Sequence, residues 1–360
     1  MIPEHVTSVL LIETTRLGDV IALLPVIPRL QRRFPNARLT LAASEKFAPL
    51  VASLDIDIDL LPMNEASGIW RNLQSIGTVR SRRYDLACSM SPSRRNALLA
   101  LASRSLFRIG YLESRNSLTP FLESTPVTGI GCMIEEQTPF AGRSIYERPH
   151  LVANAVQAPD IPGAGPSMLR SEDARAAMER LQRAGLPPPA PFGVIHPFAL
   201  WEYRAWNPRS AAELCRSIIK GLDLQVVVVG SAEDFSGSHS ELSDLFRGVG
   251  AQVFLSHDLR DTAMLLSRAR VFIGSDSGPL HLAAALGVPV VGLYGPASPH
   301  LTAPPDAGGA LLYHQLPCSP CAQRTCSSPA DSCMSRHMPE DVSAAVSRLV
   351  REQARVVANA

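Results

Sequence analysis

The sequence predicts an α/β fold built on two parallel sheets that are covered by helices. Short apolar strands alternate with helical patterns through the first half of the chain, and such alternation is typical of a parallel sheet. A turn-rich run over residues 158–167 interrupts the pattern, and four prolines follow between residues 186 and 191. Strands and helices alternate again from residue 192, so we expect two Rossmann-like domains in succession.

The first domain is expected over residues 1–170. A strand at 9–12 is followed by a helix from Asp19 to about residue 34, because apolar side chains recur there at spacings of three and four. Residues 124–145 are rich in Gly, Pro and Thr and predict loops. Further strands are expected at 38–42 and 86–90, and further helices at 96–102 and 146–155.

The second domain is expected over residues 186–340, followed by a C-terminal helix over residues 341–360. Its strands are short, apolar and separated by helical segments, as in the first domain. The expected strands lie at 192–196, 225–230, 252–254, 271–273 and 290–293.

The chain is nearly neutral overall, with a formal charge of +1, which gives no general attraction to nucleic acid. Its arginines are unevenly distributed. Residues 71–115 contain nine arginines against only Asp85 and Glu113, a local charge of +7. Since arginine suits bidentate binding of phosphate, this region is expected to hold an anionic acceptor or to contact anionic headgroups. The alternative is a solvated surface in a chain with only two lysines.

Neither a signal peptide nor a membrane-spanning helix is apparent in the sequence. Arg16 and Asp19 interrupt the apolar stretch near the start, where a signal peptide would have an unbroken apolar run. No window approaches the roughly 18–20 apolar residues that a spanning helix requires. A cytoplasmic location is therefore expected, and peripheral contact with the inner membrane stays open.

Two segments place small and polar residues where an apolar strand leads into a helix. In the first, the helix begins at Asp19; in the second, Gly274 follows the strand and Pro279 lies in the first helical turn. Backbone N–H groups at such a helix start favour an anion, and Asp276 lies where open α/β sheets bind ligands. The structural alternatives are an N-cap role for Asp19 and an ordinary buried strand–helix–strand turn for the second segment.

Three motifs occur in order along nearly the whole chain. They are RLGD at residues 16–19, IHP at 195–197 with RAWNP at 204–208, and DSGPLH at 276–281. In this order and spacing they resemble glycosyltransferase family nine, the ADP-heptose:lipopolysaccharide heptosyltransferases. The resemblance implies the GT-B architecture, in which two Rossmann-like domains face a central cleft. It also implies inverting transfer of a heptose from an ADP-sugar to the lipopolysaccharide inner core or a similar phosphorylated glycolipid, without a cofactor.

The resemblance and the chemistry of the side chains suggest roles for particular residues. Asp19 matches the family's catalytic aspartate, a general base on the acceptor hydroxyl. The expected donor-binding residues are Thr15, Arg204, Glu233, Asp276, Ser277, Gly278 and His281. The expected acceptor-binding residues, from the arginine-rich region, are Arg94, Arg95 and Arg115.

Some of these roles have structural alternatives. Thr15 could simply satisfy its turn, Glu233 could be a free surface carboxylate, and His281 could be a buried helix histidine. The middle motif also departs from the family, since Arg204 stands where relatives usually have lysine and Asn207 where proline is usual. Arginine keeps the charge and adds a planar fork that suits phosphate oxygens.

Two further residues near the motifs are expected to have structural roles, and two other segments raise the question of whether a metal ion binds there. In the middle motif, Trp206 is expected to pack and His196 to end a strand. Residues 55–59 alternate Asp and Ile like a DxD metal motif, but the alternation also predicts an edge strand, and no metal is assigned there. For the cluster Cys318, Cys321, Cys326 and Cys333, a structural metal site and free thiols both stay open, because the spacing is irregular.

Other functions are compatible with parts of the sequence pattern. The same fold with another nucleotide sugar or another acceptor is the nearest alternative. A nucleotide-sugar-binding protein without catalysis is favoured only by the altered segment 204–208, whereas intact Asp19 and Asp276 favour an enzyme. A nicotinamide dehydrogenase is disfavoured, because neither domain begins with GxGxxG and a following acidic residue.

Overall fold

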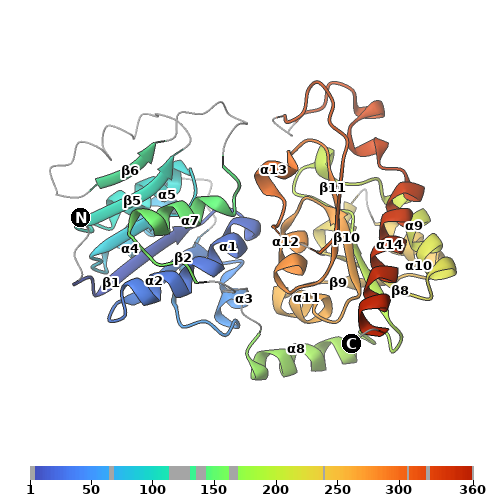
Figure 1. Cartoon of the computed structure of the whole chain (residues 1–360), viewed down its shortest axis with the longest axis horizontal. Helices are drawn as coiled ribbons and strands as arrows, with labels where there is room; N and C mark the ends of the chain where they lie inside the picture. Colours follow the sequence, from blue (N-terminus) through green and yellow to red (C-terminus); the bar gives the residue numbers. More distant parts are fainter. Residues whose placement is uncertain are drawn as a thin grey trace. The chain divides into compact units, whose positions relative to one another are not determined.

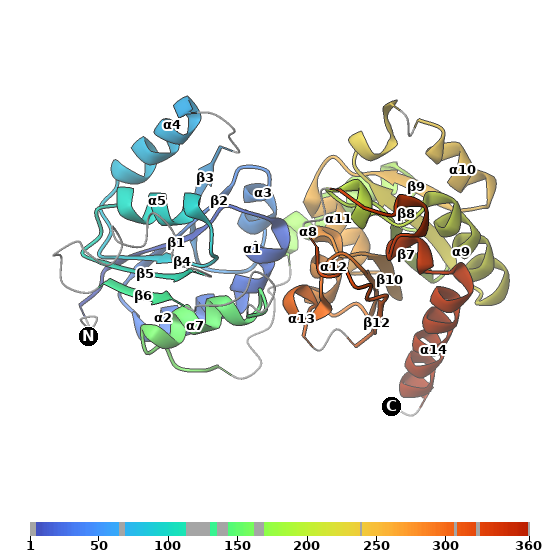
Figure 2. The same ribbon diagram turned by 90° about the horizontal axis from the view of Figure 1, so that it is seen from above.

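The computed structural model divides the chain into two compact units, Met1–Met168 and Leu169–Ala360. Figures 1 and 2 show them from two directions. Each unit has one six-stranded sheet, so the expected α/β fold with two parallel sheets is confirmed. The described residues are 5–64, 69–112, 130–134, 143–161, 169–237, 240–305, 308–321 and 325–358.

The sheet of unit 1 is parallel throughout. Its strands are β1 (Ser8–Glu13), β2 (Arg38–Ser44), β3 (Asp59–Met63), β4 (Leu86–Ser89), β5 (Phe107–Leu112) and β6 (Ile130–Ile134). They pair in the order β3-β2-β1-β4-β5-β6. Ile12 of β1 pairs with Ala42 on one side and Ser89 on the other. A central strand of this kind is covered on both faces, which explains the unbroken apolar run of β1.

Helices lie on both faces of this sheet. They are α1 (Leu17–Leu23), α2 (Ile27–Arg33), α3 (Ala48–Ala52), α4 (Ile69–Arg80), α5 (Arg94–Ala102) and α7 (Glu147–Ala155). Figure 2 shows α4 and α5 on one face and α2 and α7 on the other.

The sheet of unit 2 repeats the same strand order. Its strands are β7 (Phe192–His196), β8 (Gln225–Gly230), β9 (Gln252–Leu255), β10 (Val271–Ser275), β11 (Val290–Tyr294) and β12 (Ala310–Tyr313). They pair in parallel in the order β12-β11-β10-β7-β8-β9. Counted from the first strand of each unit, both sheets have the order 3-2-1-4-5-6 of dinucleotide-binding folds.

The helices of unit 2 form two groups. They are α8 (Ser171–Arg183), α9 (Pro208–Gly221), α10 (Leu242–Gly248), α11 (Leu259–Leu266), α12 (Gly278–Ala285), α13 (Pro299–Thr302) and α14 (Pro339–Ala358). Helix α9 packs against α10 and α14, while α11 packs against α8 and α12; Figure 1 shows α9 and α14 on the face of the sheet opposite α12. Within the described residues, no helix combines the length and apolar character that crossing a membrane requires.

The helix expected from Asp19 to about residue 34 begins two residues earlier and is divided. It runs as α1, a 3-10 turn η1 (Leu24–Val26) and α2. Pro25 and Pro28 lack the N–H that an α-helix needs at those positions, so the chain tightens between them. Asp19 lies in the first turn of α1, whose N-cap is Arg16, so the N-cap alternative for Asp19 is wrong.

Two expectations for strands are also wrong. Residues 124–145, for which loops are predicted, contain β6, a short edge strand that pairs with β5. The edge strand predicted at 55–59 begins only at Asp59, although β3 does lie at the edge of the sheet. Short edge strands depend on pairing with a neighbour more than on local composition, so their ends are poorly marked in a sequence.

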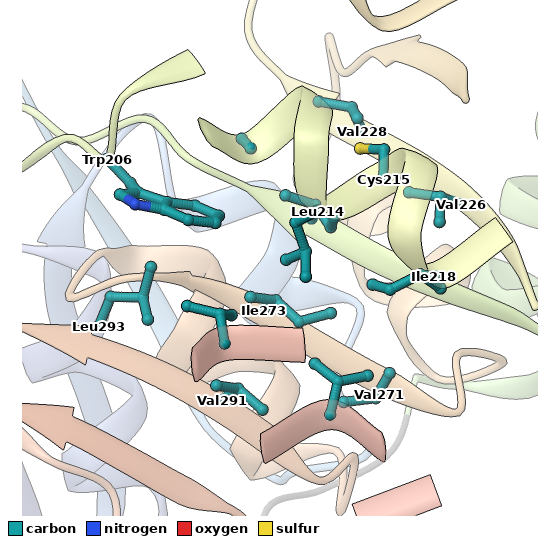
Figure 3. Close-up of a cluster of buried hydrophobic side chains, with 14 of the residues drawn as sticks. Trp206, Leu214, Cys215, Ile218, Val226, Val228, Val271, Ile273, Val291 and Leu293 are labelled. Carbon is teal, nitrogen blue, oxygen red and sulfur yellow. The ribbon is translucent and has the colours of Figure 1, made fainter. Parts of the chain in front are cut away.

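The core of unit 2 includes side chains from α9, α14 and the sheet. Trp206 is 1% exposed, and its indole N–H donates to the carbonyl oxygen of His337 at 3.0 Å. Figure 3 shows Trp206 in one cluster with Leu214 of α9, Ile273 of β10 and Leu293 of β11. The predicted packing role of Trp206 is confirmed.

A buried arginine joins α2 to α7 in unit 1. Arg29 is 2% exposed, and its guanidinium donates to Asn154 Oδ1 at 2.6 Å and to His150 Nδ1 at 2.7 Å. It also donates to two backbone carbonyl groups just after α7, at 2.9 and 3.0 Å. Burial and the Arg29 cation lower the pKa of His150, which favours the neutral ring that can accept this bond.

Arg29→Met is expected to lower the free energy of unfolding of unit 1 by about 3–5 kcal/mol, because it removes a buried charge and leaves its acceptors unpaired. Urea unfolding followed by circular dichroism measures the change. The matched control is Arg32→Met, one turn of the same helix away in sequence and exposed, for which a change within about 0.5 kcal/mol is expected. Equal losses in the two variants would contradict the role of Arg29.

Candidate active site

Each sheet has one point at which the strand order reverses. It lies between β1 and β4 in unit 1 and between β7 and β10 in unit 2. Sheets of this kind bind ligands outside the carboxyl ends of the strands at such a point. Asp276 comes directly after β10, and Asp19 lies in the first turn of the helix that follows β1, so both predicted residues follow a strand that borders a reversal point.

In unit 1, two carboxyl groups share one hydroxyl group. Glu13, the last residue of β1, is 1% exposed, and Asp19 is half-buried in the first turn of α1. The Thr15 hydroxyl oxygen lies 2.5 Å from Glu13 Oε1 and 3.0 Å from Asp19 Oδ2. The backbone N–H of Thr15 also donates to Glu13 Oε1 at 3.0 Å. Thr15, predicted to bind the donor, therefore contacts the predicted base directly.

A buried network joins this turn to the end of β4. Thr14 Oγ1 donates to Asn96 Oδ1 at 2.7 Å, and Asn96 Nδ2 donates to Ser91 Oγ at 3.0 Å and to the carbonyl oxygen of Ile12 at 3.3 Å. Sequence reasoning missed both Glu13 and Asn96. A charged residue at the end of an apolar strand is a signal that could have identified Glu13, whereas Asn96 meets this turn only through the tertiary fold.

Glu13 has a strongly altered affinity for protons. Burial and the nearby Asp19 carboxylate raise the pKa of Glu13 to about 7, while hydrogen bonds from Thr15 and Ser91 oppose that rise. A carboxyl group with this pKa changes its charge near neutral pH. Groups of this kind are concentrated at functional sites.

In unit 2, Asp276 is contacted by side chains from three other positions. Arg204, in the 3-10 turn η2 (Glu202–Arg204), pairs with Asp276 Oδ2, and the two side chains are 10% and 4% exposed. Thr302 of α13 donates to the same oxygen at 3.0 Å, and His281 Nε2 lies 3.4 Å from Oδ1. The structure thus brings together three predicted donor-binding residues and adds Thr302, for which the sequence holds no signal.

The neighbours of Asp276 keep it ionised. Burial alone would raise the pKa of the carboxyl group, but His281, the Arg204 cation and the Thr302 hydroxyl outweigh that effect and lower the pKa to about 2. The pair therefore stays charged throughout the physiological range.

Arg204 Nε and Ser277 Oγ are buried and lack a hydrogen-bond partner among the described residues, and Asp276 Oδ1 is buried with His281 Nε2 at 3.4 Å. Ser277 is the N-cap residue of α12, yet its side chain makes no capping bond, and Gly278 is the first residue of the helix. Because buried polar atoms normally have partners, unsatisfied atoms gathered beside a buried carboxylate are typical of a ligand site. The atoms offer two donors and one acceptor, which suits an anionic group next to a hydroxyl group.

Strand packing fixes the backbone at this site. Gly274 of β10 lies so close to β7 that an added Cβ would stand 2.5 Å from the carbonyl oxygen of His196. His196 ends β7, as expected, and its Nδ1 lies 2.9 Å from the carbonyl oxygen of Val229. Burial lowers the pKa of His196, which favours a neutral structural side chain over a cation at the site.

The remaining predicted site residues lie elsewhere in the two units. Glu233 is exposed in the 3-10 turn η3 (Glu233–Phe235), just after β8. Arg94 is exposed and Arg95 half-buried at the start of α5, where the Arg95 guanidinium donates to the carbonyl oxygen of Asn64. Arg115 lies outside the described residues.

The four clustered cysteines differ in burial. Cys333 is buried, Cys321 and Cys326 are half-buried, and Cys318 is exposed. Burial and the neighbouring Cys321 raise the pKa of Cys333. Among the residues that the structure describes, no group of three or more His, Cys, Asp or Glu side chains is arranged to hold a metal ion.

A model of glycosyltransferase family 9 (heptosyltransferase) matches residues 73–330. The chain is 28% identical over 333 residues to lipopolysaccharide heptosyltransferase 1 of Pseudomonas aeruginosa, which covers 88% of this chain and 87% of that relative.

Two solved E. coli structures share the fold. ADP-heptose LPS heptosyltransferase II has a TM-score of 0.71 at 21% identity and covers 97% of this chain and 100% of its own. Heptosyltransferase WaaC, determined with ADP-2-deoxy-2-fluoro heptose, has a TM-score of 0.64 at 16% identity and covers 96% of this chain and 100% of its own. These likenesses confirm the predicted α/β fold with two parallel sheets, which matches structures of the GT-B class.

Asp276→Asn is expected to lower the free energy of unfolding by about 3 kcal/mol at pH 7, because it leaves the buried Arg204 cation without its counter-charge. Urea unfolding measures the loss. The control is Asp244→Asn, a carboxylate that is 87% exposed, for which a change within about 0.5 kcal/mol is expected.

The loss of unfolding free energy caused by Asp276→Asn should depend on pH in a definite direction. The pKa of Asp276 is about 2 in the folded chain, below its ordinary value of 3.8, so the stability that its charge contributes is present above 3.8. That contribution is lost as the pH falls through about 2. The stability difference between the wild-type chain and Asp276→Asn should therefore shrink on acidification, and a constant difference would contradict the assignment.

Proposed function

The chain belongs to glycosyltransferase family 9, the heptosyltransferase family, and we propose that it transfers a heptose from ADP-heptose to the lipopolysaccharide inner core or a related phosphorylated glycolipid. The observation that carries the proposal is the pair of unsatisfied donors, Arg204 Nε and Ser277 Oγ, beside the buried Asp276 carboxylate. The relatives support the choice of donor and acceptor, since one is a lipopolysaccharide heptosyltransferase and the structure of another contains an ADP-heptose analogue.

The site in unit 2 is suited to a sugar diphosphate. Arg204 can keep Nη2 on Asp276 while its free Nε donates to a phosphate oxygen, because a guanidinium carries five donors in one plane. The Ser277 hydroxyl and the N-terminus of α12, at Gly278, add donors where the helix dipole favours negative charge. Asp276 Oδ1 is left to accept from a sugar hydroxyl, and His281 lies beside it.

Asp19 is the general base in this proposal. It removes the proton from the acceptor hydroxyl as that oxygen forms a bond to the anomeric carbon. The bond between the anomeric carbon and the diphosphate breaks, and ADP leaves with the electron pair. Attack opposite the leaving group inverts the configuration. Negative charge grows on the diphosphate, where Arg204 and the donors at α12 stabilise it.

The acceptor is assigned to residues 1–170 and the donor to residues 186–340, with residues 341–360 as a C-terminal helix. Arg94 and Arg95 support an anionic acceptor, because two cations at the N-terminus of α5 add to the positive end of the helix dipole. Arg115 is assigned to the same acceptor, and Glu233 to the ribose of the donor. A glycolipid acceptor would bring this region to a membrane surface, so the proposal includes peripheral contact with the inner membrane from the cytoplasm.

Asp19→Asn is expected to lower kcat by about a thousandfold, because an amide cannot accept the acceptor proton. The affinity for ADP should stay near normal, since Arg204, Asp276 and Ser277, which are proposed to hold the diphosphate and the sugar, belong to the other unit. Transfer assays with ADP-heptose and calorimetry with ADP measure the two quantities. Asp57→Asn, an exposed carboxylate in the same unit, is the matched control and should retain wild-type turnover. Normal transfer by Asp19→Asn would exclude this residue as the base.

Calorimetric titration in EDTA with ADP-heptose, ADP and UDP tests the donor assignment. Binding of both ADP ligands without added metal, and weaker binding of UDP, is expected. Arg204→Met should weaken ADP binding by at least about tenfold, because it removes a charge-assisted hydrogen bond to phosphate. The exposed Arg209→Met is the control on the same segment. Preference for UDP would overturn the donor, and unchanged binding by Arg204→Met would overturn its contact with the diphosphate.

A further inference from the structure

Thr15 lies between two carboxyl groups that cannot both accept its hydrogen. A hydroxyl group carries one hydrogen, yet Thr15 Oγ1 is 2.5 Å from Glu13 Oε1 and 3.0 Å from Asp19 Oδ2. Both contacts are hydrogen bonds only when one carboxyl group is protonated and donates to Thr15 while Thr15 donates to the other. The geometry is therefore that of two carboxyl groups that share one proton.

The surroundings of Glu13 explain why it is the group that holds the proton at lower pH. Asp19 and Thr15 face it from the turn after β1, and Ser91 faces it from the segment after β4. Asn96 of α5 reaches the same turn through Thr14. Burial and the Asp19 carboxylate raise the pKa of Glu13 to about 7.

We infer that Glu13 is a positioning residue that, when ionised, draws the Thr15 hydrogen away from Asp19 and so prepares Asp19 to take the acceptor proton, an inference that rests on the proposed role of Asp19. Glu13 is 1% exposed, so it acts through Asp19 and does not touch the substrate. When Glu13 is ionised, it accepts the Thr15 hydrogen, and Asp19 is left beside a second negative charge without that donor. After Asp19 takes the acceptor proton, its new O–H donates to Thr15, which continues to donate to Glu13. Ionised Glu13 therefore favours transfer of the acceptor proton to Asp19.

This arrangement links transfer to pH. Below about pH 7, Glu13 keeps its proton and donates it to the Thr15 hydroxyl. Thr15 then donates its own hydrogen to Asp19, which occupies an oxygen that the acceptor proton needs. Above about pH 7, Glu13 is ionised and accepts the Thr15 hydrogen, which leaves Asp19 free to take the acceptor proton. The rate of transfer should rise with pH through this value.

Glu13→Gln tests the inference, because it keeps the shape of the side chain and removes its charge. The maximum of kcat/KM for the acceptor should fall about tenfold, and the midpoint of its rise with pH should move at least about one unit toward acid. Asp57→Asn, an exposed carboxylate on the same unit, should leave the profile unchanged. If Glu13 only supports the fold, Glu13→Gln lowers the rate at every pH and leaves the midpoint in place, which would overturn the inference.

Infrared spectroscopy gives a second test that does not depend on sugar transfer. The wild-type chain should lose a band of a protonated carboxyl group near pH 7, and this band should be absent from Glu13→Gln. In Asp19→Asn the band should disappear at a lower pH, because coupling between two sites is reciprocal. An unchanged midpoint in Asp19→Asn would overturn the coupling even if the chain transfers heptose. A shifted midpoint in a chain that transfers no sugar would support the coupling and reject the proposed function.

Discussion

Parallel pairing of the first and fourth strands in each unit determines where the polar side chains of this protein meet. In unit 1 the pairing of β1 with β4 brings the turn after Glu13 to Asn96 at the start of α5. In unit 2 the pairing of β10 with β7 tolerates only a glycine at residue 274, because a Cβ there would collide with the carbonyl oxygen of His196. The position of Asp276 depends on this close approach, since its backbone follows directly from β10.

The pKa of a buried carboxyl group is shifted in opposite directions in the two units. Asp276 is paired with Arg204, and the charge of that partner lowers its pKa to about 2. The charged neighbour of Glu13 is Asp19, another carboxyl group, so burial and repulsion raise its pKa to about 7. The first arrangement gives a permanently charged pair, which suits a binding site for a diphosphate. The second gives a group that exchanges a proton near neutral pH, which suits the control of a base.

Arginine at position 204 explains how one side chain could serve two partners. Its Nη2 is bound to Asp276 and its Nε has no partner among the described residues, so the fork has a free side for a phosphate oxygen. A lysine at this position would carry a single ammonium group and could not present two separated nitrogens in a plane. Arg29 uses the same property within unit 1, where one guanidinium satisfies acceptors on a helix and on the segment after it.

Local patterns in the sequence were sufficient for the fold class, the family motifs and the position of Asp276 after a strand, because apolar runs and strand-end turns are properties of neighbouring residues. They were insufficient for β6, for the division of the helix after β1, and for Glu13, Asn96 and Thr302 as members of the two sites. Which groups contact one another depends on residues far apart in the chain. The sequence by itself therefore determined which chemical groups are available, and only the tertiary structure decided their partners and charge states, because burial and the distance between charges arise from packing.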